Sequence, residues 1–448
     1  MPKPKEIIGN SEGKKIDLLL NKLPDYIKYR NNELMIEDVS AIELIKEYGT
    51  PLFVISEKQV RQNYNKLCEA FSKYPKCLVA YSYKTNYLPA VCNILHQEGA
   101  GAEVVSAFEL LLAKKLGVLS SKIIFNGPGK SDEEIAMIVD EDIALVNADS
   151  IEELERINQI AKAKGKIVDV GIRVKPEVPN FFVWQKFGLD IATGEAFKAY
   201  QRASELKHIN VVGIHAHIGT QICDTRPYTE SIRQMAKLMS KVNAELEIEF
   251  EFLDIGGGFG VPGFTPLFPT EEKIEKPATV EEFGESIVTT FLSCISDYNL
   301  SEPTLVMEPG RIIITDPALI LTMVEGTKII GGSTKTVVVD AGVNLIMFAP
   351  YYYHRIVPVV IKEGAWVPVD IYGPLCMQMD VLGVNRKLPV LKRGDFLAVL
   401  DAGAYSISLS QQFIRPRPPV VMVNGGRKRL VRRGETFEDI FKCDILKL

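Results

Sequence analysis

Lys84 is the residue whose place in the sequence most directly suggests chemistry. It follows a short apolar stretch, Leu78 to Tyr83, which we expect to form a buried strand, and a helix is expected to begin near Pro89. Burial disfavours an ammonium group, so a lysine at such a place is paired, reaches solvent along its own stem, or takes part in a reaction. Taken alone, the solvent-reaching amine is the commoner outcome, and the other motifs must decide.

Three consecutive glycines, Gly256 to Gly258, follow a second apolar stretch at residues 250–255. Because glycine has no Cβ atom, the backbone N–H groups of such a run can approach an anion such as a phosphate, although a plain tight turn uses the same residues. The pattern is not a Walker loop, because no Gly-Lys-Ser/Thr sequence follows it. The run therefore predicts either a phosphate-binding loop or a turn.

A carboxylate and a guanidinium follow a third apolar stretch, in the sequence Glu308-Pro-Gly310-Arg311. The carboxylate could meet a cationic ring nitrogen and the guanidinium an anion, or the two could simply pair with each other. Both interpretations stay open from these residues alone.

Two histidines and a tyrosine complete the candidate set. His215 and His217 stand two residues apart on an expected strand and so share one side of it, which suits a metal or, better, an imidazole against a planar cofactor. The sequence offers no third metal ligand of equal quality, and we expect no metal. Tyr405 follows a glycine turn, Ala402-Gly-Ala, and is by itself more typical of packing.

Together these residues describe one ligand. A lysine, a glycine loop for phosphate, a carboxylate for a ring nitrogen and an imidazole for a ring face suit pyridoxal 5′-phosphate. A carboxylate at the nitrogen keeps the pyridinium protonated, so that the ring can accept electrons when a bond to Cα breaks.

These residues need elements that bring them to one place. Between most of the expected strands lie stretches of helical periodicity, such as Ile151 to Ala161, and this alternation implies parallel strands joined by right-handed crossovers. Eight strands are what a (β/α)8 barrel requires, although an open doubly wound sheet would also fit. The expected barrel strands are 78–83, 101–105, 122–126, 142–146, 167–174, 210–216, 250–255 and 304–308.

The pattern changes after about residue 317, where short β-rich stretches are separated by turn residues. We therefore expect an α/β protein of two domains, with a barrel at 56–316 and an all-β sandwich or barrel domain at 317–448. Strands from residues 30–55 are expected to join the second domain, and a short helix is expected at Glu438 to Phe441.

The composition excludes several classes of protein. The chain of 448 residues has a net charge of −5, which gives no reason to expect a nucleic-acid or membrane partner. No apolar run approaches a membrane span, and the first residues resemble no secretory leader. The seven cysteines are scattered without a CxxC pair, which argues against a zinc site or disulfide framework and predicts a cytoplasmic protein.

In its motifs the chain resembles the fold-type III pyridoxal-phosphate decarboxylases, the group that includes diaminopimelate and ornithine decarboxylases. The likeness runs from about residue 50 to 445 and is closest in pattern to the diaminopimelate enzymes. The segments that carry it, in the family's order, are Tyr81–Lys84, Ala216–Gln221, Gly256–Gly260, Glu308–Arg311, Gly373–Cys376 and Ala402–Tyr405.

The resemblance implies a barrel of the alanine-racemase type, a C-terminal Greek-key β domain and a homodimer with shared active sites. It makes Lys84 the Schiff-base lysine, and His217 the imidazole that stacks on the cofactor ring. Glu103 takes the place of an acidic residue near the cofactor, and Tyr405 reaches the phosphate. Cys376 becomes a proton donor to Cα, contributed across the dimer interface.

Two departures from the family's pattern concern the substrate. Diaminopimelate decarboxylases follow the loop cysteine with glutamate and ornithine decarboxylases with aspartate, whereas here Met377 follows Cys376. The diaminopimelate enzymes also carry an arginine where this chain has Met347 or Phe348. An unpaired buried charge costs several kcal/mol, so the loss of both partners should weaken binding of a doubly charged substrate end. The residues that could replace these partners are Arg311, Tyr351, His354 and Arg355.

We therefore expect an amino-acid α-decarboxylase that acts either on diaminopimelate or on a modified or carrier-tethered amino acid, in which case a carrier protein is a partner. An amino-acid racemase on the same fold is the alternative, which Glu308 disfavours because such racemases place arginine at the ring nitrogen. A non-catalytic cofactor-binding protein is a third class, which usually lacks the C-terminal β domain.

Overall fold

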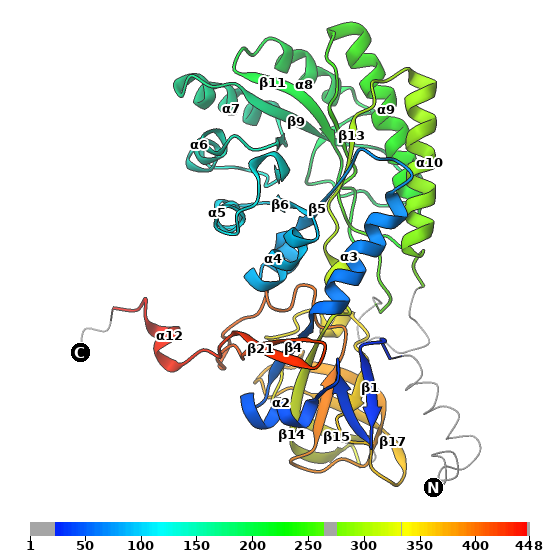
Figure 1. Cartoon of the computed structure of the whole chain (residues 1–448), viewed down its shortest axis with the longest axis vertical. Helices are drawn as coiled ribbons and strands as arrows, with labels where there is room; N and C mark the ends of the chain where they lie inside the picture. The colour runs from blue at the N-terminus through cyan, green and yellow to red at the C-terminus, as the bar shows by residue number, and fades with distance from the viewer. Residues whose placement is uncertain (1–22, 264–275, 333, 446–448) are drawn as a thin grey trace.

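The structure, a computed structural model, describes residues 23–263, 276–332 and 334–445. Two bodies lie one above the other in Figure 1, an α/β barrel and a β-rich second domain. Among the described helices, none has the length and apolar character needed to span a bilayer.

Eight parallel strands close into a barrel. Strand β13 pairs with β5 on one side and β8 pairs with β9 on the other, so the sheet has no free edge. The closed barrel was predicted, and the closure decides against the open sheet. Its strands are β5 (Cys77–Ser82), β6 (Gly101–Val104), β7 (Ile123–Phe125), β8 (Leu145–Ala148), β9 (Val168–Lys175), β11 (Ile209–His215), β12 (Phe252–Asp254) and β13 (Thr304–Met307).

Helices cover the outside of this barrel (Figure 1). Several begin at a serine or threonine whose side chain accepts a hydrogen bond from the first turn, such as Ser131 at α6 and Thr279 at α10. The helices are α3 (Glu57–Phe71), α4 (Pro89–Gln97), α5 (Ala107–Lys115), α6 (Asp132–Glu141), α7 (Ile151–Ala163), α8 (Glu195–Ser204), α9 (Arg226–Leu246) and α10 (Val280–Tyr298). Short elements are η2 (Tyr83–Thr85), η3 (Ser120–Lys122), β10 (Leu189–Asp190) and α11 (Arg311–Ile314).

The strand predicted at 142–146 begins too early. Helix α6 continues to Glu141 and ends at Asp142, which has a left-handed backbone with φ of 50°, so the chain reaches the barrel only at Leu145. The apolar pair Ile143-Ala144 belongs to the turn between helix and strand. Apolar character alone therefore misplaced this strand by three residues.

The second domain is built around β14 (Ala318–Ile330), which pairs with a strand from near the N-terminus. The N-terminal strand β4 (Leu52–Ser56) lies between β14 and β20, antiparallel to the first and parallel to the second. One N-terminal strand therefore shares a sheet with strands from the C-terminal part of the chain. The remaining strands are β15 (Thr334–Val339), β16 (Ile356–Pro358), β17 (Trp366–Tyr372), β18 (Val381–Pro389), β19 (Phe396–Val399), β20 (Val420–Asn424) and β21 (Arg427–Arg432).

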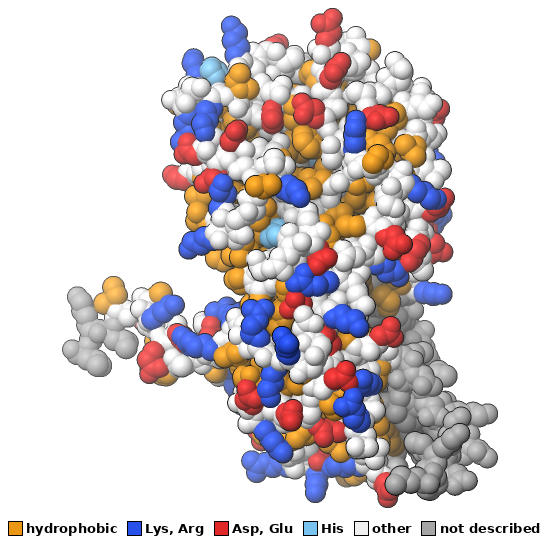
Figure 2. Space-filling view, in the orientation of Figure 1, with side chains coloured by type: hydrophobic (Ala, Val, Ile, Leu, Met, Phe, Trp, Pro, Cys, Tyr) orange, Lys and Arg blue, Asp and Glu red, His pale blue; other side chains and the backbone are white. Residues whose placement is uncertain are grey.

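Strands β18 and β21 were not predicted. Residues 427–432 read Arg-Lys-Arg-Leu-Val-Arg, a sequence without the apolar alternation that would indicate a strand, and in the structure they are largely exposed. Near the N-terminus, β1 (Ile27–Arg30), β2 (Glu33–Ile36) and β3 (Val39–Ser40) form a small sheet, followed by α2 (Ala41–Tyr48). The short elements η5 (Ala349–Tyr351) and α12 (Phe437–Phe441) complete the domain. Figure 2 shows charges of both signs interspersed over the visible face.

Candidate active site

The predicted lysine and its acidic neighbours lie where barrel strands end. Lys84 belongs to η2, directly after β5, while Glu103 lies within β6 and Glu308 directly follows β13. The carboxyl ends of all strands in a parallel barrel open on the same face, where such barrels place their chemistry. Residues far apart in the sequence therefore meet at one mouth.

Lys84 forms an ion pair with Glu103, in which Nζ lies 2.5 Å from Oε2. The carboxylate side chain is 1% exposed and that of the lysine 35%, so the amine alone keeps access to the barrel mouth. Burial lowers the pKa of Lys84, but the charges of Glu103 and Glu308 outweigh it and raise that pKa above its usual value. Of the three interpretations of this lysine, the structure shows the paired one, with Glu103 as the partner.

Glu308 is buried and surrounded by polar groups. Its Oε1 accepts a hydrogen bond from Nδ2 of Asn126, and its Oε2 lies 3.7 Å from Nε2 of His215. Burial by itself raises the pKa of Glu308, but His215, Asp254 and Lys84 lower it well below the usual range. The residue is an anion fixed in place at the barrel mouth.

The two histidines have different surroundings. His217 accepts a hydrogen bond at Nδ1 from the N–H of Gly257 at 3.0 Å, and its ring lies 5.5 Å from that of Trp184. Burial, followed by the charge of Lys84, lowers the pKa of His217 to about 3, so the ring is neutral. His215 is fully buried inside the barrel, and only His217 keeps a partly exposed ring.

The glycine run packs tightly against this cluster. A Cβ atom on Gly256, where φ is +67°, would lie 2.8 Å from Nδ1 of His217, and one on Gly257 would lie 2.1 Å from the carbonyl oxygen of Glu308. The N–H groups of these two glycines already bond to Asp254 and His217. An anion at this loop must therefore be held by other donors, and close packing is what demands glycine at both positions.

Arg311 and Tyr405 bring the two domains together at the site. The Arg311 guanidinium lies 4.8 Å from the centre of the Tyr405 ring, and its Nε is buried without a hydrogen-bond partner among the described residues. Tyr405 donates from its backbone N–H to Thr85 at 2.8 Å, next to Lys84. At Gly310 a Cβ would lie 2.0 Å from Oγ1 of Thr85, so glycine allows this close approach. Glu308 and Arg311 do not pair with each other.

Asn126 and Asp254 belong to the site and were not predicted. Asn126 immediately follows β7 and donates to Glu308 and, at 3.4 Å, to Oε1 of Glu103. Asp254 is the last residue of β12 and is fully buried. The sequence feature that could have found both is a polar residue at the carboxyl end of an apolar strand.

Cys376, Met377 and Tyr351 belong to the second domain. All three side chains are exposed, those of Met377 and Tyr351 by 44% each. Among the described residues, no hydrogen bond, ion pair or ring contact joins them to Lys84 or Glu308. The single chain thus pairs the lysine with an acid, whereas no such contact among the described residues joins the predicted proton donor to that pair.

Buried Asp380 ties the loops that carry these residues together. It accepts hydrogen bonds from the N–H of Val343 at 2.7 Å and from that of Leu375 at 2.6 Å. The loop with Met377 is thus fixed to the loop that leads to Tyr351.

The comparisons with known proteins place this arrangement in a class. Residues 57–315 match the family model described as the pyridoxal binding domain of pyridoxal-dependent decarboxylases. A diaminopimelate decarboxylase of Aquifex aeolicus is 35% identical, over 94% of this chain and 98% of that protein. One of Methanocaldococcus jannaschii is 36% identical, over 94% and 97%. A crystal structure of the M. jannaschii enzyme in complex with L-lysine superposes with a TM-score of 0.88, covering 94% of this chain and 98% of that one.

The closed parallel barrel and the β-rich second domain are the fold that this chain shares with these relatives. The chain belongs to the pyridoxal-dependent decarboxylases. It is a carboxy-lyase whose cofactor is pyridoxal 5′-phosphate.

The residues present fit this cofactor. Lys84 offers an amine at the mouth, Glu308 an anion for the ring nitrogen, and Arg311 an unpartnered guanidinium nitrogen for an anion. The neutral ring of His217 stands beside them. When bound, the cofactor supplies a protonated ring that accepts the electron pair left when carbon dioxide departs from Cα.

Proposed function

We propose that the protein decarboxylates a free or modified amino acid at Cα, with Lys84 as the residue that holds the cofactor. The observation that carries the proposal is the Lys84 amine, paired with Glu103 and under the charge of Glu308 at the barrel mouth. Glu308 would hold the proton of the ring nitrogen in place, and His217 would pack on the ring face. Gly256 to Gly258, Gly310 and Tyr405 would complete the cofactor site.

Diaminopimelate is the substrate named for the relatives, and the two methionines bear on whether it is used here. The side chains of Met347 and Met377 are 47% and 44% exposed, and neither can pair with a charged substrate end. Two of the residues that could compensate are already engaged. Arg355 pairs with Asp401, with Nε 2.7 Å from Oδ2, and His354 bonds to the carbonyl oxygen of Leu400.

His354 is also unsuited to carry charge, because burial lowers its pKa to about 4. We therefore propose a substrate whose distal end carries less charge than that of diaminopimelate, such as a modified or carrier-tethered amino acid. Arg311 remains for the α-carboxylate or the cofactor phosphate.

Carbon dioxide release from a substrate panel tests this proposal. The panel contains meso-diaminopimelate, both enantiomers of lysine and of ornithine, and glutamyl- and citrate-linked amines. Turnover of a linked amine above that of diaminopimelate is expected. Turnover of meso-diaminopimelate with the highest kcat/KM of the panel would overturn the substrate assignment and leave the decarboxylase intact.

The double variant M347R/M377E tests the same idea in reverse. It restores both charges that the family's diaminopimelate enzymes carry, so kcat/KM for meso-diaminopimelate should rise relative to that for lysine. M347R/M379E is the matched control, because it adds the same two charges with the acid two residues further along the loop. An equal change in both variants would show that only the added charge of the loop matters.

We further propose a homodimer in which Cys376 of the partner subunit delivers a proton to Cα. Its exposed thiol on the second domain supports a site completed by a second copy. K84A and C376A proteins, each inactive, should regain partial activity when unfolded and refolded together.

We place the protein in the cytoplasm, where seven free thiols suit the reducing conditions.

A further inference from the structure

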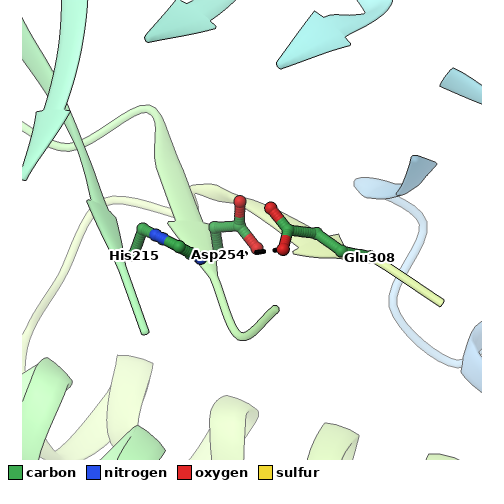
Figure 3. Close-up of side chains that lie close together, drawn as sticks. All are labelled: His215, Asp254 and Glu308. Carbon is green, nitrogen blue, oxygen red and sulfur yellow. Dashed lines mark ion pairs between the residues drawn. The ribbon is translucent and has the colours of Figure 1, made fainter. Parts of the chain in front are cut away.

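At the barrel mouth, His215, Asp254 and Glu308 form a buried cluster where three neighbouring strands end (Figure 3). In the strand register His215 lies beside Asp254, and Asp254 beside Val306, two residues before Glu308. The exposed fractions are 0%, 0% and 3%, so no water screens the two carboxyl groups from each other. Figure 3 shows the carboxyl groups of Asp254 and Glu308 facing each other.

The hydrogen bonds of this cluster are incomplete as long as both acids are ionised. Oδ1 of Asp254 accepts from the N–H of Gly256 at 2.9 Å, but Oδ2 has no donor among the described residues. Neither ring nitrogen of His215 has a hydrogen-bond partner there either. Two carboxylates cannot bond to each other without a proton, and two buried charges side by side repel strongly.

We propose that Asp254 is a positioning residue. It carries a proton on Oδ2 and, through this proton, donates a hydrogen bond to Glu308. The proposal deepens the function above, because it rests on Glu308 as the partner of the ring nitrogen. The proton gives Oδ2 of Asp254 a hydrogen-bond partner and removes one of the two facing charges. Glu308 is then held from two sides, by Asn126 and by Asp254.

The surroundings decide which acid keeps the proton. Glu308 faces the amide of Asn126, the charge of Lys84, and two histidines within 4 Å. Asp254 has one backbone donor, and burial and the neighbouring charge of Glu308 raise its pKa well above the usual range. Burial lowers the pKa of His215 in spite of the opposing charge of Glu308 and leaves the ring neutral. The proton therefore stays on Asp254, and Glu308 remains the anion.

Infrared spectroscopy of the cofactor-free protein at neutral pH tests the proton directly. The difference spectrum between wild type and D254N should contain the C=O band of a protonated carboxylic acid. D190N is the control and should show no such band, since Asp190 pairs with Lys175 at 3.0 Å. Absence of the band in the D254N difference would overturn the proposal. Its presence also excludes a cation held by the three side chains, which would require an ionised Asp254.

Kinetics of two variants test the positioning role. D254N keeps a donor toward Glu308 and an acceptor for Gly256, whereas D254A removes both. D254A should lose about 10–100-fold in kcat/KM, the usual effect of removing a group that orients a functional residue, with D254N recovering most of it. Equal losses in the two variants, or none in either, would overturn the proposal.

The proposed role of Glu308 and the proton on Asp254 can be overturned independently. If E308Q decarboxylates as fast as wild type, the proposed role of Glu308 is wrong, while the infrared band still reports on Asp254. If the band is missing but E308Q is inactive, the function stands and the proton assignment falls. The visible absorbance of the holoenzyme, followed against pH, should shift in D254A and not in D254N.

Discussion

Asn147 donates a hydrogen bond from Nδ2 to Oδ1 of Asn126 at 2.7 Å, and this bond fixes which way the Asn126 amide faces. With Oδ1 engaged, Nδ2 is directed to Glu308 and Glu103. One amide thus joins the carboxylate that pairs with Lys84 to the carboxylate proposed for the ring nitrogen. Behind it, the carbonyl oxygen of Asn147 accepts from buried Lys130 at 2.8 Å.

Replacing Asn126 by alanine should lower kcat/KM by about 10–100-fold, because both carboxylates lose the donor that orients them. N126D should be worse, since it adds a third carboxylate beside two buried ones. Steady-state kinetics and cofactor retention, followed by absorbance, measure both. N158A is the control: Asn158 bonds to the backbone of His208 and should leave the kinetics unchanged. Activity in N126D equal to that of wild type would contradict the bridging role.

Attachment of the cofactor to Lys84 should depend on Glu103 in a definite direction. An aldehyde reacts with the neutral amine, and in the cofactor-free protein the charge of Glu103 raises the pKa of Lys84. E103Q removes that charge, so the pKa falls and attachment should become faster at neutral pH. Stopped-flow absorbance between pH 6 and 9 should show a pH profile moved to lower pH.

E98Q provides the control for this prediction, because Glu98 pairs with Arg61 on the helical surface away from the site. An unchanged pH profile in E103Q would contradict the proposed control of Lys84. K84A should lose both the absorbance of the attached cofactor and the turnover. If K84A kept both, the assignment of Lys84 would be wrong.

The barrel could be predicted because apolar runs alternate with stretches of helical periodicity. Lys84 and Glu308 were found because each directly follows an apolar run, and Glu103 through the family resemblance; the structure pairs Lys84 with Glu103 and places Glu308 close enough for its charge to act on Lys84. Asn126 and Asp254 end strands in the same way but matched no chemical expectation for the cofactor, so they were missed. Their roles depend on side chains from neighbouring strands, and register across a barrel cannot be read from one segment.

The second domain was predicted less completely. Strand β21 is formed by basic residues that pair with β20, so its position is set by the partner strand and not by its own pattern. Arg355 and His354 were considered as residues that could contact the substrate. In the structure they bond instead to Asp401 and Leu400, almost fifty residues away in the chain. Long-range pairing of this kind leaves no trace in local spacing.

Asp380 should be essential for the substrate loops. D380N replaces one acceptor by a donor, so the N–H of Val343 or of Leu375 loses its partner, at a cost of about 1–3 kcal/mol in unfolding free energy. KM should rise at the same time, because the loops that carry Met377 and Tyr351 lose their link. Urea denaturation and substrate kinetics measure the two effects. D370N, which disturbs one exposed bond to Asn385, should change neither by as much.

Glu109 should make stability depend on pH near neutrality. The residue is 4% exposed at the start of α5, and burial, with the nearby charge of Glu103, raises its pKa to about 7 from 4.5. The folded protein therefore holds a proton that the unfolded chain has released, and stability from this group is full below pH 4.5 and is lost as the pH rises through 7. E109Q does not titrate, so it should match wild type at pH 4 and exceed it at pH 8, by on the order of 3 kcal/mol. Thermal melting of the cofactor-free protein at both pH values measures this difference, with exposed Glu152→Gln as the control. A melting temperature of E109Q equal to that of wild type at pH 8 would show that Glu109 is already ionised in the folded state without cost.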